Sequence, residues 1–280
     1  MLNTRITIAG VSFKNPVMTA SGTFGSGMEY AEFVDLNSLG AVVTKGVANV
    51  PWEGNPTPRV QETYGGMLNA IGLQNPGIDV FIERDIPFLK QYDTRIIVNV
   101  CVRSVSDYVE VVEKLADQPV DMLEINVSCP NVKHGGIAFG QDPKCLFDIT
   151  REIKAKAKQP IIMKLSPNVT DIAEMARAAE AAGSDALSLI NTITGMKIDI
   201  HKRTFALANR TGGLSGPAIK PVAVRMVYQA ANAVKIPIIG MGGIADAEDA
   251  IEFMLAGATG IAVGAMNFVN PYTTVEVVRG

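Results

Sequence analysis

The sequence is poor in the residues that build metal and disulfide sites. Its 280 residues include three cysteines, Cys101, Cys129 and Cys145, and two histidines, His134 and His201. The cysteines are far apart and form no CxxC pair, which argues against a disulfide framework and against an iron–sulfur cluster held by this chain alone. Two histidines argue against a histidine-rich zinc site. We therefore expect this chain to bind no metal.

Charged residues are also scarce, and no long hydrophobic run is present. They make up 19% of the chain with a net charge of −3 and form no basic run, so nucleic acid is not an expected partner. No apolar stretch approaches the roughly 18–20 residues of a membrane helix, and the first ten residues hold no signal-peptide core. We therefore expect a cytoplasmic protein without a membrane partner. The low charged fraction also suggests a surface partly covered by another subunit.

Apolar residues, in contrast, are abundant at 48%, which excludes a disordered chain. Most of the short apolar runs are followed by an amphipathic stretch with helical periodicity. The eight runs are Val17–Ala20, Ala41–Lys45, Ile96–Cys101, Met122–Asn126, Ile161–Leu165, Ala186–Ile190, Ile236–Met241 and Gly260–Gly264. The clearest amphipathic stretches are Val105–Ala116, Leu146–Lys158, Asp171–Ala182, Pro221–Val234 and Asp246–Ala256.

This alternation predicts an α/β fold, a (β/α)8 TIM barrel that occupies residues 1–280 as a single domain. An open doubly wound sheet is the alternative, although no GxGxxG motif opens the first helix. Arg5–Ile8 and Val11–Phe13 predict an N-terminal β-hairpin that caps the bottom of the barrel. The long connections Ala48–Gly77, Val127–Lys144 and Thr192–Lys220 are expected to be loops on the face where barrel enzymes place their chemistry.

The apolar runs terminate in polar residues, which are expected to form a ring at that same face. Two lysines directly after buried strands indicate an anionic ligand. The ring comprises Ser21, Lys45, Asn99, Asn126, Lys164 and Asn191.

Glycine-rich turns follow the seventh and eighth runs, at Gly240–Asp246 and Val263–Ala265. Glycines let backbone N–H groups approach a phosphate, and the helix that starts near Asp246 is expected to add its positive end. Lys45 or Lys164 could stabilise the charge of a reduced flavin. Either lysine could instead form a Schiff base in an aldolase-like barrel.

Cys129 lies in the loop after the fourth run, among polar residues on the reactive face. A modest lowering of its thiol pKa would make it a general base near neutral pH. The glycine-rich residues that follow, 132–140, have the composition of a mobile lid. Cys101, inside a strand, and Cys145, at a helix start, are interpreted as packing residues.

Six segments stand out as motifs in the order in which they occur: Ala20–Gly25, Thr44–Val47, Asn69–Gly77, Asn126–Asn131, Lys164–Asn168 and Gly212–Gly216. On these segments the sequence resembles, over nearly its whole length, the dihydroorotate dehydrogenases, in particular the NAD-linked class 1B catalytic subunits. It lacks the N-terminal membrane segment and the serine base of the membrane-linked class. It ends at Gly280, where relatives generally continue, so a shortened C-terminal helix is expected.

The resemblance implies oxidation of (S)-dihydroorotate to orotate in de novo pyrimidine biosynthesis, on one FMN per chain. Cys129 would remove the proton from C5 while hydride passes from C6 to flavin N5. The implied substrate-binding residues are Lys45, Asn69, Ala70, Ile71, Gly72, Leu73, Asn126, Asn131, Asn191 and Thr192. The implied FMN-binding residues are Ser21, Lys45, Gly46, Asn99, Asn126, Lys164, Ile190, Gly216, Gly242, Gly243, Gly264 and Ala265.

The class 1B resemblance further implies an electron-transfer subunit that carries FAD and an iron–sulfur cluster and passes electrons to NAD, in a heterotetramer of two plus two chains. Three alternatives stay open from the sequence: a fumarate-dependent class 1A-like enzyme, a Schiff-base aldolase-type barrel, and a non-catalytic barrel scaffold.

Overall fold

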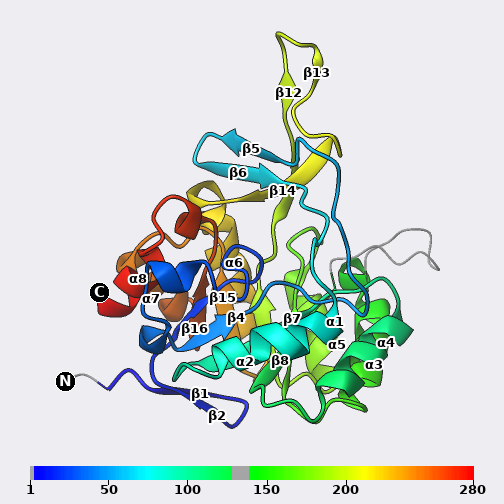
Figure 1. Cartoon of the computed structure of the whole chain (residues 1–280), viewed down its shortest axis with the longest axis vertical. Coiled ribbons are helices and arrows are strands. Elements are labelled where there is room, and N and C mark those ends of the chain that lie inside the picture. The colour runs from blue at the N-terminus through cyan, green and yellow to red at the C-terminus, as the bar shows by residue number, and fades with distance from the viewer. Residues whose placement is uncertain (1–2, 128–138) are drawn as a thin grey trace.

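Eight parallel strands close into a barrel in the computed structural model, which describes residues 3–127 and 139–280 (Figure 1). Each strand lies within or one residue beyond a predicted apolar run, so the TIM-barrel prediction is confirmed. Around the barrel the strands are β3 (Val17–Thr19), β4 (Ala41–Val43), β7 (Arg95–Val100), β8 (Met122–Asn126), β9 (Ile161–Lys164), β10 (Ala186–Leu189), β15 (Ile238–Met241) and β16 (Gly260–Val263).

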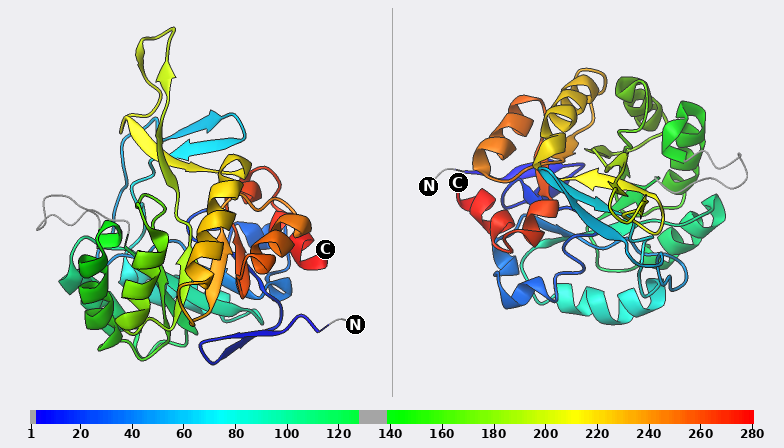
Figure 2. Two further views of the ribbon diagram at one scale, coloured as in Figure 1. Left: turned by 180° about the vertical axis from the view of Figure 1, so that it is seen from behind. Right: turned by 90° about the horizontal axis from the view of Figure 1, so that it is seen from above.

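Helices surround the barrel (Figure 2). Three of the predicted helices begin at an aspartate whose side chain accepts a backbone N–H, at Asp142, Asp171 and Asp246, and a fourth begins at Ser104 in the same way. The helices are α1 (Ile78–Val80), continued through a π-helical turn η3 (Phe81–Asp85) into α2 (Ile86–Leu89), then α3 (Val105–Leu115), α4 (Pro143–Lys154), α5 (Ile172–Ala181), α6 (Lys220–Ala231), α7 (Ala247–Leu255) and α8 (Thr273–Arg279).

The first crossover departs from the strict alternation of strand and helix that the sequence predicts. Between β3 and β4 the chain forms two 3-10 turns, η1 (Tyr30–Glu32) and η2 (Leu36–Ser38), instead of an α-helix. The 3-10 turn is a tighter element that proteins use in short connections. The chain therefore crosses from β3 to β4 without an α-helix.

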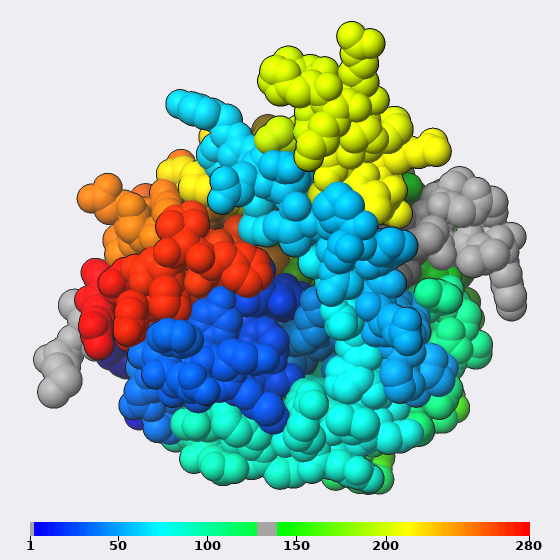
Figure 3. All heavy atoms as spheres, turned by 45° about the horizontal axis from the view of Figure 1, so that its top comes forward, coloured from blue at the N-terminus to red at the C-terminus, as the bar shows by residue number. Residues whose placement is uncertain are grey.

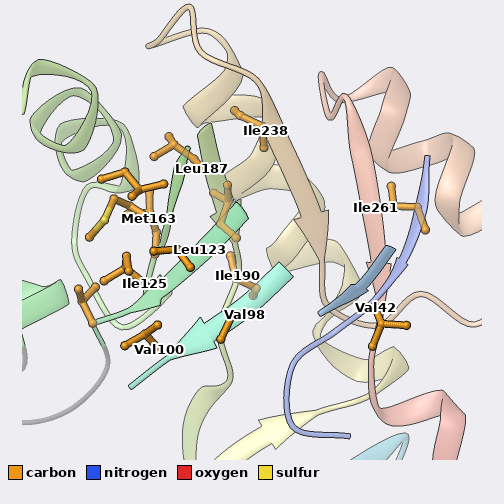
Figure 4. Close-up of a cluster of buried hydrophobic side chains, with 14 of the residues drawn as sticks. Val42, Val98, Val100, Leu123, Ile125, Met163, Leu187, Ile190, Ile238 and Ile261 are labelled. Atoms are coloured by element: carbon orange, nitrogen blue, oxygen red, sulfur yellow. The ribbon is translucent and has the colours of Figure 1, made fainter. Parts of the chain in front are cut away.

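The barrel wall is apolar on both faces. Side chains that point outward, such as Val98, Leu123 and Leu187, pack under the helices (Figure 4). Side chains two positions apart along a strand share a face, and the inward set forms a separate buried cluster that includes Ile97 and Ile162. These continuous apolar runs explain why strands buried on both faces could be recognised in the sequence.

The predicted hairpin closes the lower end of the barrel. Strands β1 (Ile6–Ile8) and β2 (Val11–Phe13) pair across Ala9 and Gly10, which have φ angles of 48° and 82°. Two consecutive left-handed residues give the turn whose twist suits a two-residue hairpin. Ile8 and Phe13 are buried and belong to the same cluster as the inward barrel residues. The hairpin-cap prediction is confirmed.

A second, antiparallel sheet forms where the sequence predicts loops. It contains β5 (Val60–Thr63) and β6 (Gly66–Asn69) from one long connection and β11 (Ile193–Met196) and β14 (Thr211–Ser215) from another, in the order β11-β14-β6-β5. The prediction that Ala48–Gly77 and Thr192–Lys220 are loops is therefore wrong. A further hairpin, β12 (Ile198–Asp199) and β13 (Thr204–Phe205), projects from this sheet (Figure 1).

Glycines allow the close approach of the strands in this sheet, and they also make its strands hard to recognise in the sequence. A Cβ on Gly66 would collide with the carbonyl oxygen of Ser215, and one on Gly213 would collide with the side chain of Thr192. Glycine is depleted in strands in general, so the pattern looks like a loop. Of the third predicted loop, residues 128–138 lie outside the described residues. Within the described ranges, no helix combines the length and apolar character needed to cross a membrane.

The hairpin cap generates the first prediction. Replacing Phe13 with alanine removes a side chain that is 1% exposed and seals the barrel interior, so the free energy of unfolding should fall by about 3–5 kcal/mol. Urea denaturation followed by circular dichroism measures the change. Ser12→Ala, on the exposed face of the same strand, is the matched control and should change stability by less than about 0.5 kcal/mol. Equal losses in the two variants would contradict the sealing role.

Candidate active site

A pocket of about 400 Å³ opens at the carboxyl ends of the barrel strands, roofed by the second sheet. In the space-filling view of Figure 3, the strands of the second sheet, cyan and yellow, stand over the barrel. Cys129 and Asn131 lie outside the described residues. All the other predicted site residues line this one pocket: Ser21, Lys45, Gly46, Asn69, Ala70, Ile71, Gly72, Leu73, Asn99, Asn126, Lys164, Ile190, Asn191, Thr192, Gly216, Gly242, Gly243, Gly264 and Ala265.

A buried hydrogen-bond network lies at the floor of the pocket. Lys164 Nζ donates to Ser21 Oγ at 2.9 Å and lies 3.5 Å from Glu124 Oε2. The same carboxylate accepts from Asn99 Nδ2 at 2.5 Å and from Ser188 Oγ at 2.7 Å. All of these residues except Ser21 are buried. The network therefore ties four neighbouring strands to the loop after β3.

Strand alternation explains why these polar side chains meet. Asn99, Glu124, Lys164 and Ser188 each follow, two residues later on the same strand, an inward apolar residue of the barrel interior. They form the next inward layer, one step nearer the pocket. Glu124 and Ser188 were not predicted as site residues from the sequence. A lone carboxylate within the apolar run Met122–Asn126 was the available signal, because an unpaired charge is rarely buried.

Lys45 is in a different electrostatic state. Burial, and then the positive charge of Arg59, hold the pKa of Lys45 below its ordinary value of 10.5, while Cys101 partly offsets this. Among the described residues its Nζ atom has no hydrogen-bond or ion-pair partner. A partly buried ammonium group without a counter-ion is suited to an anionic ligand. The positive charge of Lys164 is compensated by Glu124, whereas the positive charge of Lys45 has no counter-ion among the described residues.

Amide side chains form one wall of the pocket. Asn191 Nδ2 donates to Asn126 Oδ1 at 3.1 Å, and Asn191 Oδ1 accepts from the Thr192 N–H at 2.8 Å. Asn168, which the sequence analysis did not assign to the site, holds this wall in place: its Nδ2 donates to the Thr192 carbonyl at 3.1 Å, and its Oδ1 accepts from the Thr194 N–H at 2.9 Å. Amides present both donors and acceptors, so this wall can recognise a polar ring.

The segment Ala70–Leu73 is shaped by a residue further along the same motif. Asn75 Oδ1 accepts from the N–H groups of Ala48 and Gly77 at 3.1 and 3.0 Å, and its Nδ2 donates to the Leu73 carbonyl at 2.7 Å. Gly72 and Leu73 both have positive φ, at 75° and 58°. The Asn-Pro-Gly part of the motif therefore holds the backbone that lines the pocket.

The glycine-rich corner has a backbone conformation that suits close approach of a ligand. Gly242 and Gly243 adopt φ angles of 123° and 85°, as expected for a loop that approaches a ligand closely. At the N-terminus of α7, Asp246 accepts from the Asp249 N–H and Asp249 accepts from the Ala245 N–H. The contribution of that helix end to phosphate binding stays a prediction.

The end of a different helical turn faces this corner. The 3-10 turn η7 (Ala265–Phe268) begins after Gly264, and no side chain caps it. Asp249 and then Glu252 hold the pKa of Lys220 above its usual value by hydrogen bonding to it, so this ammonium is engaged elsewhere. A phosphate here would be held by backbone N–H groups.

Cys101 was also misplaced by the sequence analysis. It is buried as expected, but β7 ends at Val100 and Cys101 lines the pocket beside Gly46. The sequence pattern around a buried cysteine is the same whether the cysteine lies within a strand or just after its end, so the position of Cys101 could not be told from the sequence. Cys145 lies in the first turn of α4, as predicted.

Comparison with known proteins decides the family, because the family profile described as dihydroorotate dehydrogenase matches residues 1–280. The chain belongs to the dihydroorotate dehydrogenase family. Members of this family are oxidoreductases and generally depend on a flavin.

Curated relatives are similar over the full length of the chain. The chain is 73% identical over 279 residues to a protein of Lachnoclostridium phytofermentans named dihydroorotate dehydrogenase B (NAD(+)), catalytic subunit, covering 100% of this chain and 93% of that one. It is 66% identical over 279 residues to a protein of the same name from Alkaliphilus metalliredigens, covering 100% and 92%.

A solved structure supports the fold. The crystal structure of a dihydroorotate dehydrogenase from Eimeria tenella, in complex with ferulenol, superposes with a TM-score of 0.81 at 23% identity, covering 99% of this chain and 83% of that one. At this identity the likeness concerns the fold alone.

The residues of the pocket fit a flavin nucleotide. Its volume lies within the range of cofactor sites. Glycines line it at Gly242, Gly243 and Gly264, and two lysines, Lys45 and Lys164, line it near the carboxyl ends of β4 and β9. This is the donor set that a phosphate and an electron-accepting ring require.

Gly243 generates the second prediction. A Cβ at this position would lie 2.8 Å from Lys220 Cβ and 3.0 Å from the Gly216 carbonyl oxygen, on a backbone with φ of 85°. Gly243→Ala should therefore push the loop of Gly243 away from the segment Gly216–Lys220 in the glycine-rich corner. Flavin binding should weaken about tenfold or more. Flavin fluorescence titration of the stripped protein measures the affinity.

Gly183→Ala is the matched control. Gly183 also has a left-handed φ, of 99°, but an added Cβ would contact only the Lys154 side chain at 3.4 Å, and the residue does not line the pocket. This variant should lose some stability and keep its flavin affinity. Unchanged flavin affinity in Gly243→Ala would mean that the phosphate is held elsewhere.

Proposed function

We propose that the chain is a single FMN-binding barrel domain, residues 1–280, that oxidises (S)-dihydroorotate to orotate in de novo pyrimidine biosynthesis in the cytoplasm. The observation that carries the proposal is the lining of one pocket. Glycine-rich turns, a lysine paired with a carboxylate (Lys164), a lysine without a counter-ion among the described residues (Lys45) and several asparagine side chains all line it. Relatives that share 73% and 66% of their residues with this chain carry the name of this activity.

FMN is proposed to lie along the pocket floor with its phosphate at the glycine corner. Gly216, Gly242, Gly243, Gly264 and Ala265 would surround the phosphate. The ring would contact Ser21, Lys45, Gly46, Asn99, Asn126, Lys164 and Ile190. When bound, FMN supplies the acceptor for the hydride that leaves the substrate.

The substrate is a polar ring with amides, carbonyls and a carboxylate. We propose that Asn69, Asn126, Asn131, Asn191 and Thr192 recognise its edges and that Ala70, Ile71, Gly72 and Leu73 bound the space it occupies. Lys45 would bind the carboxylate, because it is the lysine whose charge is uncompensated within the described residues. Cys129 would take the proton from C5, as the family resemblance implies.

Electrons are proposed to leave through a second subunit. The relatives are named as catalytic subunits with NAD(+) as acceptor, which supports a partner chain. This chain has three cysteines far apart and no GxGxxG motif, so we propose that the partner supplies FAD and an iron–sulfur cluster in a heterotetramer of two plus two chains. Exposed apolar side chains on the projecting hairpin, Ile198, Ile200 and Phe205, are consistent with a surface that another chain covers.

The test of the proposed function is purification followed by flavin analysis and turnover. The isolated chain should contain FMN and reduce a dye with dihydroorotate, but it should reduce NAD poorly until the partner subunit is added. The readouts are dye bleaching and NADH absorbance. A preparation without flavin would refute the cofactor, rapid NAD reduction by the isolated chain would refute the partner, and brisk fumarate reduction would move the chain to the fumarate-using class.

Replacing the proposed base gives a sharper test of the chemistry. Cys129→Ser should keep its flavin and lose about 10²–10⁴-fold in turnover at neutral pH, because a hydroxyl is a much weaker base than a thiolate. The rate should recover partly as the pH rises. Cys145→Ser is the control: burial and then the neighbouring Asp142 raise the pKa of that thiol, and the residue does not line the pocket. Unchanged neutral-pH turnover in Cys129→Ser would reject the assignment.

Lys45 predicts how ligand affinity depends on pH. Its pKa is lowered, so it loses its proton below pH 10.5, and the orotate carboxylate then loses its counter-ion. The dissociation constant of orotate should rise about tenfold or more as the pH is raised from 7 toward 10.5. Flavin absorbance changes on titration with orotate report the constant.

Lys45→Arg is the matched variant, since arginine stays protonated over this range. Its dissociation constant for orotate should stay nearly flat between the same pH values. Parallel rises in the two proteins would show that another group titrates.

A further inference from the structure

We propose that Glu124 is a positioning residue that fixes Lys164 and Asn99 at the pocket floor and limits the positive charge that the pocket presents to the flavin. This inference rests on the proposed function, because it concerns the flavin ring. It adds a residue that does not line the pocket and acts through two that do.

The contacts of Glu124 place it at the centre of the floor. Its side chain is 1% exposed, and its two oxygens have three partners on three other strands: Asn99 on β7, Lys164 on β9 and Ser188 on β10. The pairing register sets Asn99 directly beside Glu124, and Lys164 beside Ser188. Each partner therefore has a fixed direction before any ligand binds.

The charge balance of the pocket depends on this carboxylate. Of the described residues that line the pocket, Lys45 and Lys164 carry charge, both positive. Lys164, 4% exposed, lies 3.5 Å from Glu124 Oε2, whereas Lys45 has no such partner within the described chain. Removing the Glu124 charge would leave two uncompensated ammonium groups at one site.

Charge at this depth acts strongly on a bound ring. Coulomb interactions are screened little in a buried site, so one elementary charge several ångströms away shifts an equilibrium by an order of magnitude or more. Reduction of a flavin adds negative charge to its ring, and Lys164 stabilises that charge. Glu124 opposes this effect while it orients the lysine. The balance between the two groups would then set the reduction potential of the flavin.

The experiment compares Glu124→Gln with Lys164→Met in the flavin-loaded chain, with no substrate present. Glutamine keeps the shape and acceptor oxygen of glutamate and removes its charge. The measured quantity is the ratio of reduced to oxidised flavin at a fixed dye poise and pH 7. We expect the ratio to rise about tenfold in Glu124→Gln, which is about 30 mV, and to fall by a similar factor in Lys164→Met.

Asp85→Asn is the matched control. Asp85 is also a buried carboxylate with hydrogen-bond partners, Ser26 and Arg84, but it does not line or support the pocket floor. Its ratio should equal that of the unaltered chain. If the role of Glu124 were purely structural, Glu124→Gln would bind flavin more weakly, but its ratio of reduced to oxidised flavin would not rise. An unchanged or lowered ratio in Glu124→Gln overturns the proposal.

A second measurement covers the case in which a variant does not hold flavin. Urea unfolding of Glu124→Gln, Lys164→Met and the double variant, all without flavin, gives the coupling between the two side chains. We expect the double variant to lose less stability than the two single variants together, because neither charge is left alone; additive losses would overturn the proposal. A chain that never binds flavin would refute the proposed function, while this cycle would still report on the pair.

Discussion

The period of two along each barrel strand constrains where polar groups can lie in this protein. Inward positions in the lower part of the barrel are apolar, as at Ile97, Met122 and Ile162. The next inward positions, two residues later, carry Asn99, Glu124 and Lys164. Because the strands are closed and in register, these side chains must satisfy one another. The hairpin keeps water from the lower end, and the second sheet covers the upper end.

The two pocket lysines show how the same residue type is given two states by its surroundings. Lys164 belongs to a strand and lies 3.5 Å from a carboxylate oxygen on the adjacent strand β8. Lys45 lies past the end of β4, where burial and Arg59 disfavour its charge and no carboxylate faces it within the described residues. The Lys164 ammonium group is thereby paired within the protein. The Lys45 ammonium group is the one that a negatively charged ligand would stabilise most.

The sequence was sufficient for the barrel and for most of the pocket, for a physical reason. Strands buried on two faces are continuous apolar runs, and the residues at their carboxyl ends converge whatever the loops do, so Ser21, Asn126 and Lys164 could be placed together. The strands β6 and β14 could not be found, because glycines interrupt their pattern and their pairing with each other, Leu68 with Leu214, joins segments far apart in the sequence. Glu124 was missed because its role depends on side chains of neighbouring strands that are far from it in the sequence.

The pairing of β6 with β14 also has a consequence for how the molecule folds. It joins a segment that follows β4 to one that follows β10, so the roof of the pocket forms only after both parts of the barrel have been brought together. Contacts between distant segments carry a large loop-closure entropy and are made late and slowly. A chain in which these two segments have not yet met would therefore lack a complete ligand site. In this protein, cofactor uptake would report that both halves of the chain have been brought together.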